Sequence, residues 1–178
     1  PRAIGLSIVF TDEFGDSISN ALLKSTLTQN IVLSSYFEDN FTNEIIPKTI
    51  LKTDSHPFGF LNVKLDNDGI LRKIMPYKTL YNSTIKYSFA LQLFNTAFPN
   101  SIFKTNKNLE IITLRGKKKI NENSMYIDFS QTIKSKIEQY NFAEFIDKFN
   151  TIGFDKRYNY IVLLGINSRE FSAYWNTT

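Results

Sequence analysis

Three near-continuous apolar runs occupy residues 4–10, 31–37 and 160–166 of the chain. A strand that is buried on both faces is apolar at almost every position, whereas a strand with one solvated face alternates between apolar and polar. The three runs therefore predict strands that lie in one largely parallel sheet, covered by helices on both faces. Residues 16–30 between the first two runs have helical spacing, which predicts a strand–helix–strand unit with a right-handed crossover.

The middle of the chain predicts a hairpin. Residues 58–65 and 70–80 are β-rich, and residues 66–69 between them read Asp-Asn-Asp-Gly. Glycine accepts a positive φ, and Asn and Asp tolerate it best among the other residues, so this run is typical of a tight turn. We expect the two segments to pair antiparallel around it, with positive φ at Gly69. Arg72 lies three residues past Gly69, where it could reach a carboxylate of the turn and lock it.

Two helices are predicted in the second half of the chain. Apolar residues at helical spacing run from position 87 to position 98, and Pro99 ends that helix. A shorter helix is marked by four apolar residues after position 140 and ends before Gly153. Two β-rich segments, 109–114 and 125–129, lie between these helices.

Together these elements predict an α/β fold with a mixed, largely parallel central sheet flanked by helices and an inserted antiparallel hairpin. A chain of 178 residues with 42% apolar residues can bury one full core, so we expect residues 1–178 to form a single domain. The chain begins at Pro1, almost directly before an apolar strand. We therefore expect an excised part of a longer protein.

Charge adds one feature, a basic cluster at residues 115–119 that reads Arg-Gly-Lys-Lys-Lys, within a formal net charge of +4. Charge runs between apolar segments are usually solvated, so we expect a hairpin tip here. Phosphate binding by this tip is the alternative. No aromatic residues alternate with the lysines, as they do in many nucleic-acid sites, and we expect no nucleic-acid partner.

The residue inventory excludes several kinds of catalytic site. The chain has no cysteine and one histidine, His56, so it has neither a thiolate nucleophile nor a site with several histidines. Its seven glycines do not recur at the spacing of a phosphate-binding loop. We expect no catalytic, cofactor or metal site.

The turn at residues 66–69 resembles part of a calcium loop. With Gly69 at the glycine position of that loop, Asp66 and Asp68 fall on ligand positions. The first ligand position is then Lys64 and the closing glutamate position is Met75, and neither side chain can bind calcium. A structural turn is the better interpretation.

Asp128 is the most notable carboxylate, because it stands inside the apolar segment 126–129. It either caps a neighbouring turn or faces a ligand cleft. In the second case the cleft would lie where this segment and residues 160–166 end, next to Asn167. An intracellular α/β enzyme, with Asp12, Asp128 and Asn167 at strand ends, is the main rival interpretation. A purely structural module is a third.

The order of several short motifs resembles the CHASE domain of the second class, the cyclase- and histidine-kinase-associated sensory extracellular domain. The family shows a glycine-led strand, then D-x-D-G-[VI]-x-R-[RK], then a helix that opens on S-[FL]-A-L. The matching residues here are 59–63, the run 66–73 and the run 87–91, with further matches at 3–10, 126–129 and 160–165. Its structural signature falls on Asp66, Asp68, Gly69, Arg72 and Gly165. The chain departs from the pattern at Ser7, where the family usually has an acidic residue, and after Gly165, where an Asp and a Thr-Pro are missing. The family's opening strand and helix and its exit toward the membrane are also missing, so the resemblance implies a domain truncated at both ends.

The resemblance implies a non-catalytic, extracytoplasmic sensory domain of a bacterial membrane-bound receptor, on the periplasmic side or at the cell surface. Such receptors are of the histidine kinase or nucleotide cyclase type. The implied partners are a small-molecule or protein stimulus, the membrane helices and signalling output domain of the parent chain, and a second copy in a homodimer. No cofactor is implied.

Overall fold

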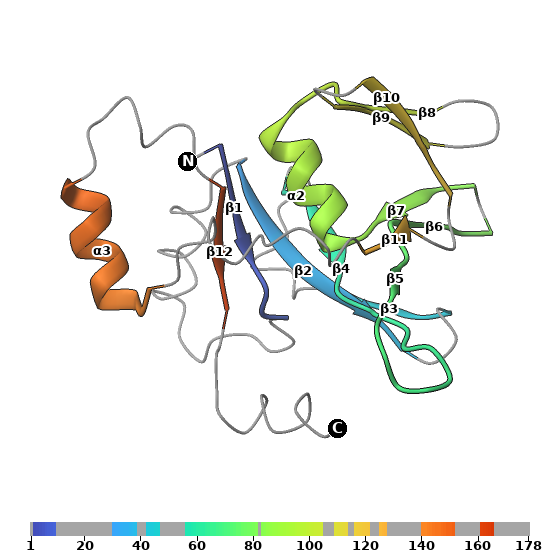
Figure 1. Cartoon of the computed structure of the whole chain (residues 1–178), viewed down its shortest axis with the longest axis horizontal. Helices are drawn as coiled ribbons and strands as arrows, with labels where there is room; N and C mark the ends of the chain where they lie inside the picture. The colour runs from blue at the N-terminus through green and yellow to red at the C-terminus, as the bar shows by residue number, and fades with distance from the viewer. Residues whose placement is uncertain are drawn as a thin grey trace.

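The computed structural model describes residues 2–9, 30–38, 42–46, 56–81, 83–104, 109–113, 116–121, 125–127, 140–151 and 161–165, and the fold is given for these (Figure 1). Its main sheet has the order β12–β1–β2, with β4 also paired to β2 and the short β3 on the end of β2. The strands are β1 (Ala3–Leu6), β2 (Ile31–Phe37), β3 (Glu44–Ile45), β4 (Phe58–Phe60) and β12 (Ile161–Leu164).

The pairings in this sheet confirm the parallel arrangement of the three apolar runs. β1 lies between β12 and β2 and is parallel to both, with Leu6 next to Leu164 on one side and Leu33 on the other. β4 is parallel to β2, whereas β3 is antiparallel to it. Val32 and Leu33 are consecutive and both fully buried, as expected for a strand covered on both faces.

Helix α2 (Phe89–Ala97) covers one face of this sheet. Its inner residues Phe89, Leu93 and Ala97 pack on Ala3 of β1 and Val32 of β2 in one buried cluster. The helix begins at Ser88, whose side-chain oxygen accepts a hydrogen bond from the backbone N–H of Leu91 at 3.3 Å, so the predicted helix is confirmed. The helix predicted at 16–30 lies, except for Asn30, outside the described residues.

Three smaller sheets and a second helix complete the described fold. The order β10–β9–β8 is antiparallel throughout, β5 pairs with β11, and β6 pairs with β7. Leu109 and Ile120 of the first of these sheets form a second buried cluster with Tyr77 and with Leu91 of α2. The elements are β5 (Lys73–Ile74), β6 (Tyr77–Thr79), β7 (Ile85–Tyr87), β8 (Ile102–Lys104), β9 (Leu109–Thr113), β10 (Gly116–Ile120), β11 (Met125–Tyr126) and α3 (Phe142–Thr151).

The predicted antiparallel pairing of residues 58–65 with 70–80 is wrong, although the turn between them forms. β4 joins β2 instead, and the second segment divides between β5, which pairs with β11, and β6, which pairs with β7. The turn closes through the Asp66 N–H on the Ile70 carbonyl at 3.0 Å, with φ +78° at Gly69 as predicted. Outside the turn, the segments 58–65 and 70–80 pair with other strands and not with each other.

The basic cluster lies in an antiparallel hairpin, as predicted, but it extends from the end of the hairpin into one arm. Residues 116–120 form strand β10, in which Gly116 pairs with Thr113 of β9 and the buried Ile120 pairs with Leu109. Lys117, Lys118 and Lys119 are exposed, so their solvation is as expected. Lysines on an edge strand also disfavour pairing with other chains.

Neither of the helices described in this structure has the length and hydropathy needed to span a membrane.

Candidate functional site

The candidate site is the edge of the main sheet where its parallel strands end. Ser7 follows β1, Glu38 follows β2, Asn62 lies just beyond β4, and Gly165 follows β12. Parallel strands share one carboxyl edge, and ligands of open α/β sheets bind outside that edge. β1 has β12 on one side and β2 on the other, so the strand order reverses at β1. This geometry makes the edge the first place to look for a ligand.

Ser7 and Gly165 meet at the point of reversal. The backbone N–H and the Oγ of Ser7 both donate to the Leu164 carbonyl, at 2.9 and 3.1 Å. A Cβ added to Gly165 would collide with the Ser7 hydroxyl. A side chain at position 165 would therefore displace the Ser7 hydroxyl, and the hydrogen bonds of Ser7 to Leu164 tie β12 to β1.

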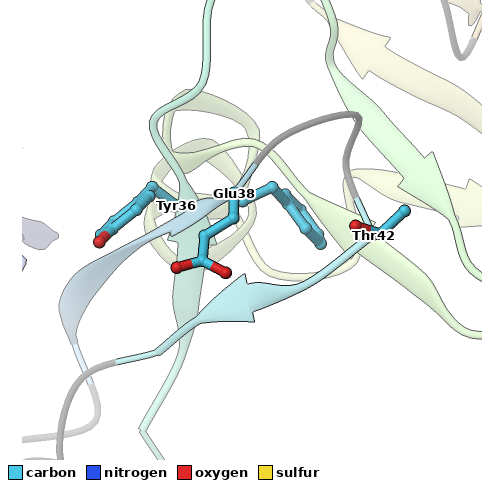
Figure 2. Close-up of a pocket in the computed structure, with 4 residues that line it drawn as sticks. Tyr36, Glu38 and Thr42 are labelled. Atoms are coloured by element: carbon cyan, nitrogen blue, oxygen red, sulfur yellow. The ribbon is translucent and has the colours of Figure 1, made fainter.

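A pocket of about 550 Å³ opens at the end of β2, lined by Tyr36, Phe37, Glu38 and Thr42. Figure 2 shows the Tyr36 ring and the Glu38 carboxylate on the same side of the strand. Phe37 is buried and packs edge-on against Phe60, with ring centroids 5.4 Å apart. The alternation of the strand thus turns Phe37 into the core and leaves Tyr36 and Glu38 at the surface.

Two side-chain amides fix the walls of this pocket. Asn62 accepts a hydrogen bond from the Phe37 N–H at 2.6 Å and donates one to the Phe37 carbonyl at 2.8 Å, so it clips the end of β2 to the segment after β4. Asn43 donates from Nδ2 to Oε2 of Glu38 at 2.8 Å, and its carbonyl accepts the Glu38 N–H at 2.8 Å. These two bonds orient the Glu38 carboxylate through one of its oxygens.

A charged network beside the pocket joins β3 and β7 to the sheet. Glu44 of β3 accepts a hydrogen bond from the buried Ser35 hydroxyl at 2.8 Å and forms an ion pair with Lys86 of β7 at 3.0 Å. Lys86 also lies over the ring of Phe58, with its Nζ 4.7 Å from the centroid. The Glu44 side chain is 11% exposed, so the carboxylate of this ion pair is largely removed from water.

Arg72 locks the acidic turn, as expected from its position. Its Nη1 and Nη2 donate to the two oxygens of Asp68 at 2.8 and 2.7 Å, and Nη1 also lies 3.1 Å from Asp66. The Arg72 guanidinium, together with the Ile70 N–H, lowers the pKa of Asp68 to about 2. The same bonds raise the pKa of Arg72. The turn is therefore a structural unit in which Arg72 already pairs with both carboxylates.

The remaining candidates from the sequence are not brought into this site by the described structure. Asp128, Asn167 and Asp12 lie outside the described residues. Within the described part of the chain, no three acidic, histidine or cysteine side chains gather where they could hold a metal ion.

Tyr36, Glu38, Asn43 and Asn62 were not singled out from the sequence. Tyr36 ends an apolar run, and Glu38 opens a polar segment that gave no pattern of its own. Asn62 stands within the glycine-led motif, where a polar residue among Leu61 and Val63 was the one available signal.

Comparison with protein-family models matches the CHASE2 domain over residues 1–178. No curated protein and no solved structure gave a significant match.

Proposed function

The chain belongs to the CHASE2 domain family, a family of extracellular sensory domains in signalling receptors, and from this we propose that it is the non-catalytic input domain of a membrane-bound receptor. The receptor is of the histidine kinase or nucleotide cyclase type, and the domain lies on the periplasmic side or at the cell surface. The match over the whole chain is the observation that carries this proposal.

The geometry of the carboxyl edge supports a sensory role. The described pocket wall is built from the end of β2 and from Thr42, which precedes β3. Side-chain hydrogen bonds join the end of β2 to Asn43 before β3 and to Asn62 after β4. An occupant that contacts several of these ends can favour one arrangement of them over another. Differential affinity of that kind is all that a sensor needs to shift an equilibrium between two states.

Asp128 and Asn167 belong to the same proposal. We place them at a ligand cleft near the ends of the segments 126–129 and 160–166, on the reasoning that strand ends of an α/β sheet present polar groups to a ligand. The residues of the turn, Asp66, Asp68, Gly69 and Arg72, have a structural role in this proposal. No catalytic or cofactor-binding role is assigned to any residue.

The partners proposed for the domain follow from its place in a receptor. They are a small-molecule or protein stimulus, the membrane helices and output domain of the parent chain, and a second copy of the domain in a homodimer. Nucleic acid is not among them.

The test uses the full-length receptor. Replacement of residues 1–178 by an unrelated folded domain should abolish the response to stimulus while the output domain keeps its basal activity. Asp128→Ala should reduce the response, whereas unchanged signalling and an unchanged melting temperature would remove Asp128 from both the cleft and the turn-capping roles. Turnover of a substrate by the isolated chain would support the alternative, an intracellular α/β enzyme.

A further inference from the structure

The end of β2 presents an aromatic ring and a carboxylate to the same pocket. Tyr36 and Glu38 are two residues apart, so strand alternation puts them on one side, roughly 7 Å apart along the chain. Figure 2 shows both side chains extending from that side. Tyr36 is 37% exposed, so a ligand in the solvent can reach it.

The described residues that line the pocket carry one negative charge and no positive charge. Glu38 is the charged residue among the described residues that line it, and none of these is cationic. The π-face of a tyrosine ring is also negative, and it attracts cations within about 6 Å of its centre. Thr42 adds a hydroxyl group to the lining. An anionic ligand would be repelled here, whereas a cation would meet both a full negative charge and a quadrupole.

The carboxylate is held in place for such a ligand. Asn43 bonds to Oε2 of Glu38, and the backbone of the same two residues is bonded through the Glu38 N–H. The side chain of Asn62 bonds to both the backbone N–H and the backbone carbonyl of Phe37, the residue before Glu38. A group that is already ordered loses little conformational freedom on binding, which favours affinity.

The size and donor set distinguish an organic cation from a metal ion. The pocket volume of about 550 Å³ lies within the range of small-molecule sites, about 300–1,000 Å³. Divalent calcium or magnesium takes several oxygen ligands, commonly more than one carboxylate, whereas Glu38 is the one carboxylate among the described residues that line this pocket. A small molecule with an ammonium group needs one carboxylate and one aromatic face.

We propose that the pocket formed by Tyr36, Glu38 and Thr42 binds a small organic molecule that carries an ammonium group. The ammonium lies over the Tyr36 ring and against the Glu38 carboxylate, and the Thr42 hydroxyl bonds to a polar group elsewhere on the ligand. This inference deepens the proposed sensory function and rests on it for its biological meaning, but the binding itself can be measured on the chain alone.

The experiment compares choline with 3,3-dimethylbutan-1-ol, its neutral carbon isostere, by isothermal titration calorimetry on the 178-residue chain, with ethanolamine as a primary ammonium probe. At least one ammonium probe should bind, and the isostere should bind at least tenfold more weakly than choline if choline is the probe that binds. Glu38→Gln preserves the shape of the side chain and should weaken binding at least tenfold. Tyr36→Leu should do the same, whereas Tyr36→Phe keeps the ring and should retain most of the affinity.

Glu110→Gln, in strand β9 of another sheet, is the matched control and should leave the affinity unchanged. The melting temperature of each variant shows whether it is folded. If Glu38→Gln does not fold, the affinities of Tyr36→Phe and Tyr36→Leu still test the proposal. Equal binding of choline and its isostere, undiminished binding by folded Glu38→Gln, or no binding of either ammonium probe at millimolar concentration would each overturn the proposal. If ammonium binding fails while domain replacement still abolishes the receptor response, only the ligand class is wrong. If ammonium binding succeeds and domain replacement has no effect, the sensory function is wrong.

Discussion

Arg72 binds Asp68 through two parallel hydrogen bonds, Nη1 to Oδ1 at 2.8 Å and Nη2 to Oδ2 at 2.7 Å. This is the bidentate arrangement that a planar guanidinium makes with a carboxylate. The two residues are four positions apart and close the turn that Gly69 permits. The acidic residues of the D-x-D-G motif and its distal arginine are therefore parts of one turn.

The first prediction is a pH dependence carried by Asp68. Its pKa falls from 3.8 to about 2 on folding, chiefly through the Arg72 hydrogen bonds. A lowered pKa in the folded state contributes stability above the unfolded pKa, and this contribution is lost as the pH falls through about 2. Asp68→Asn should therefore lower the melting temperature modestly at pH 5, because the pair is exposed, and the difference from the wild type should shrink between pH 4 and pH 2.

Thermal unfolding followed by circular dichroism at several pH values checks this. Arg72→Gln removes the same interaction from the other side, so it should show the same convergence with the wild type at low pH. A melting-temperature difference that stays constant from pH 5 to pH 2 would contradict the assignment.

The second prediction concerns Gly69, whose φ is +78° while the space around a Cβ at this position is open. The cost of substitution is therefore conformational rather than steric. Gly69→Ala should reduce the free energy of unfolding by about 1–2 kcal/mol, since the left-handed region is unfavourable for residues with a Cβ. Gly69→Asn should cost less, because Asn tolerates this region. Urea denaturation measures both, and equal costs for the two variants would argue against a conformational origin.

The third prediction concerns Gly59 in β4, which lies directly under the start of α2. An added Cβ would come within 2.7 Å of the Phe89 Cα and 2.8 Å of the Ser88 carbonyl oxygen, so backbone would have to move. Gly59→Ala should cost about 3 kcal/mol or more, at the upper end for overpacking.

Gly5→Ala is the matched comparison for Gly59→Ala. A Cβ at Gly5 would meet side-chain atoms, the Phe89 Cζ at 2.8 Å and the Leu163 Cδ2 at 2.9 Å, and side chains can rotate away. We expect a cost of about 1–2 kcal/mol. Urea denaturation of both variants decides the matter, and a larger loss for Gly5→Ala than for Gly59→Ala would show that the helix moves more easily than its side chains.

Local patterns were enough to predict the elements that depend on neighbours in sequence. The parallel strands followed from apolar runs, α2 from its spacing and Pro99, and the turn from its Asn, Asp and Gly residues. Each of these depends on side-chain periodicity or on the backbone preferences of a few residues. The same logic failed for the hairpin arms, because the partner of a strand is a tertiary choice. The Leu61 N–H bonds to Ser35 of β2 at 2.8 Å, and no turn residue encodes that.

The site shows the same division. Asn62 acts on Phe37, 25 positions away, and the meeting of these two residues depends on β4 lying beside β2. Ser7 and Gly165 meet through the pairing of β1 with β12. The predicted cleft residues Asp128 and Asn167 stay predictions. Sequence reasoning placed the cleft at the ends of the segments 126–129 and 160–166, whereas the described pocket lies at the end of β2.

The last prediction concerns the Glu44–Lys86 ion pair. The two residues come from β3 and β7, and their side chains are 11% and 27% exposed. Removal of one partner from a shielded pair leaves a charge without compensation, which is usually more costly than removal of both. Lys86→Met should therefore lower the free energy of unfolding by about 1–3 kcal/mol, less than for a fully buried pair because Lys86 still reaches water.

A double-mutant cycle with Glu44→Gln isolates the interaction from the other contacts of each side chain, including that of Lys86 with Phe58. The double variant should lose less stability than the sum of the two single variants. Lys118→Met, on the exposed edge strand β10, is the control and should change stability by no more than about 0.5 kcal/mol. Additive single effects would mean that Glu44 is held by Ser35 alone.

Since Glu44 follows Thr42 and Asn43 directly, coupling would also predict weaker ammonium binding by Lys86→Met. In that variant Asn43, which bonds to Glu38, is less firmly fixed to the sheet.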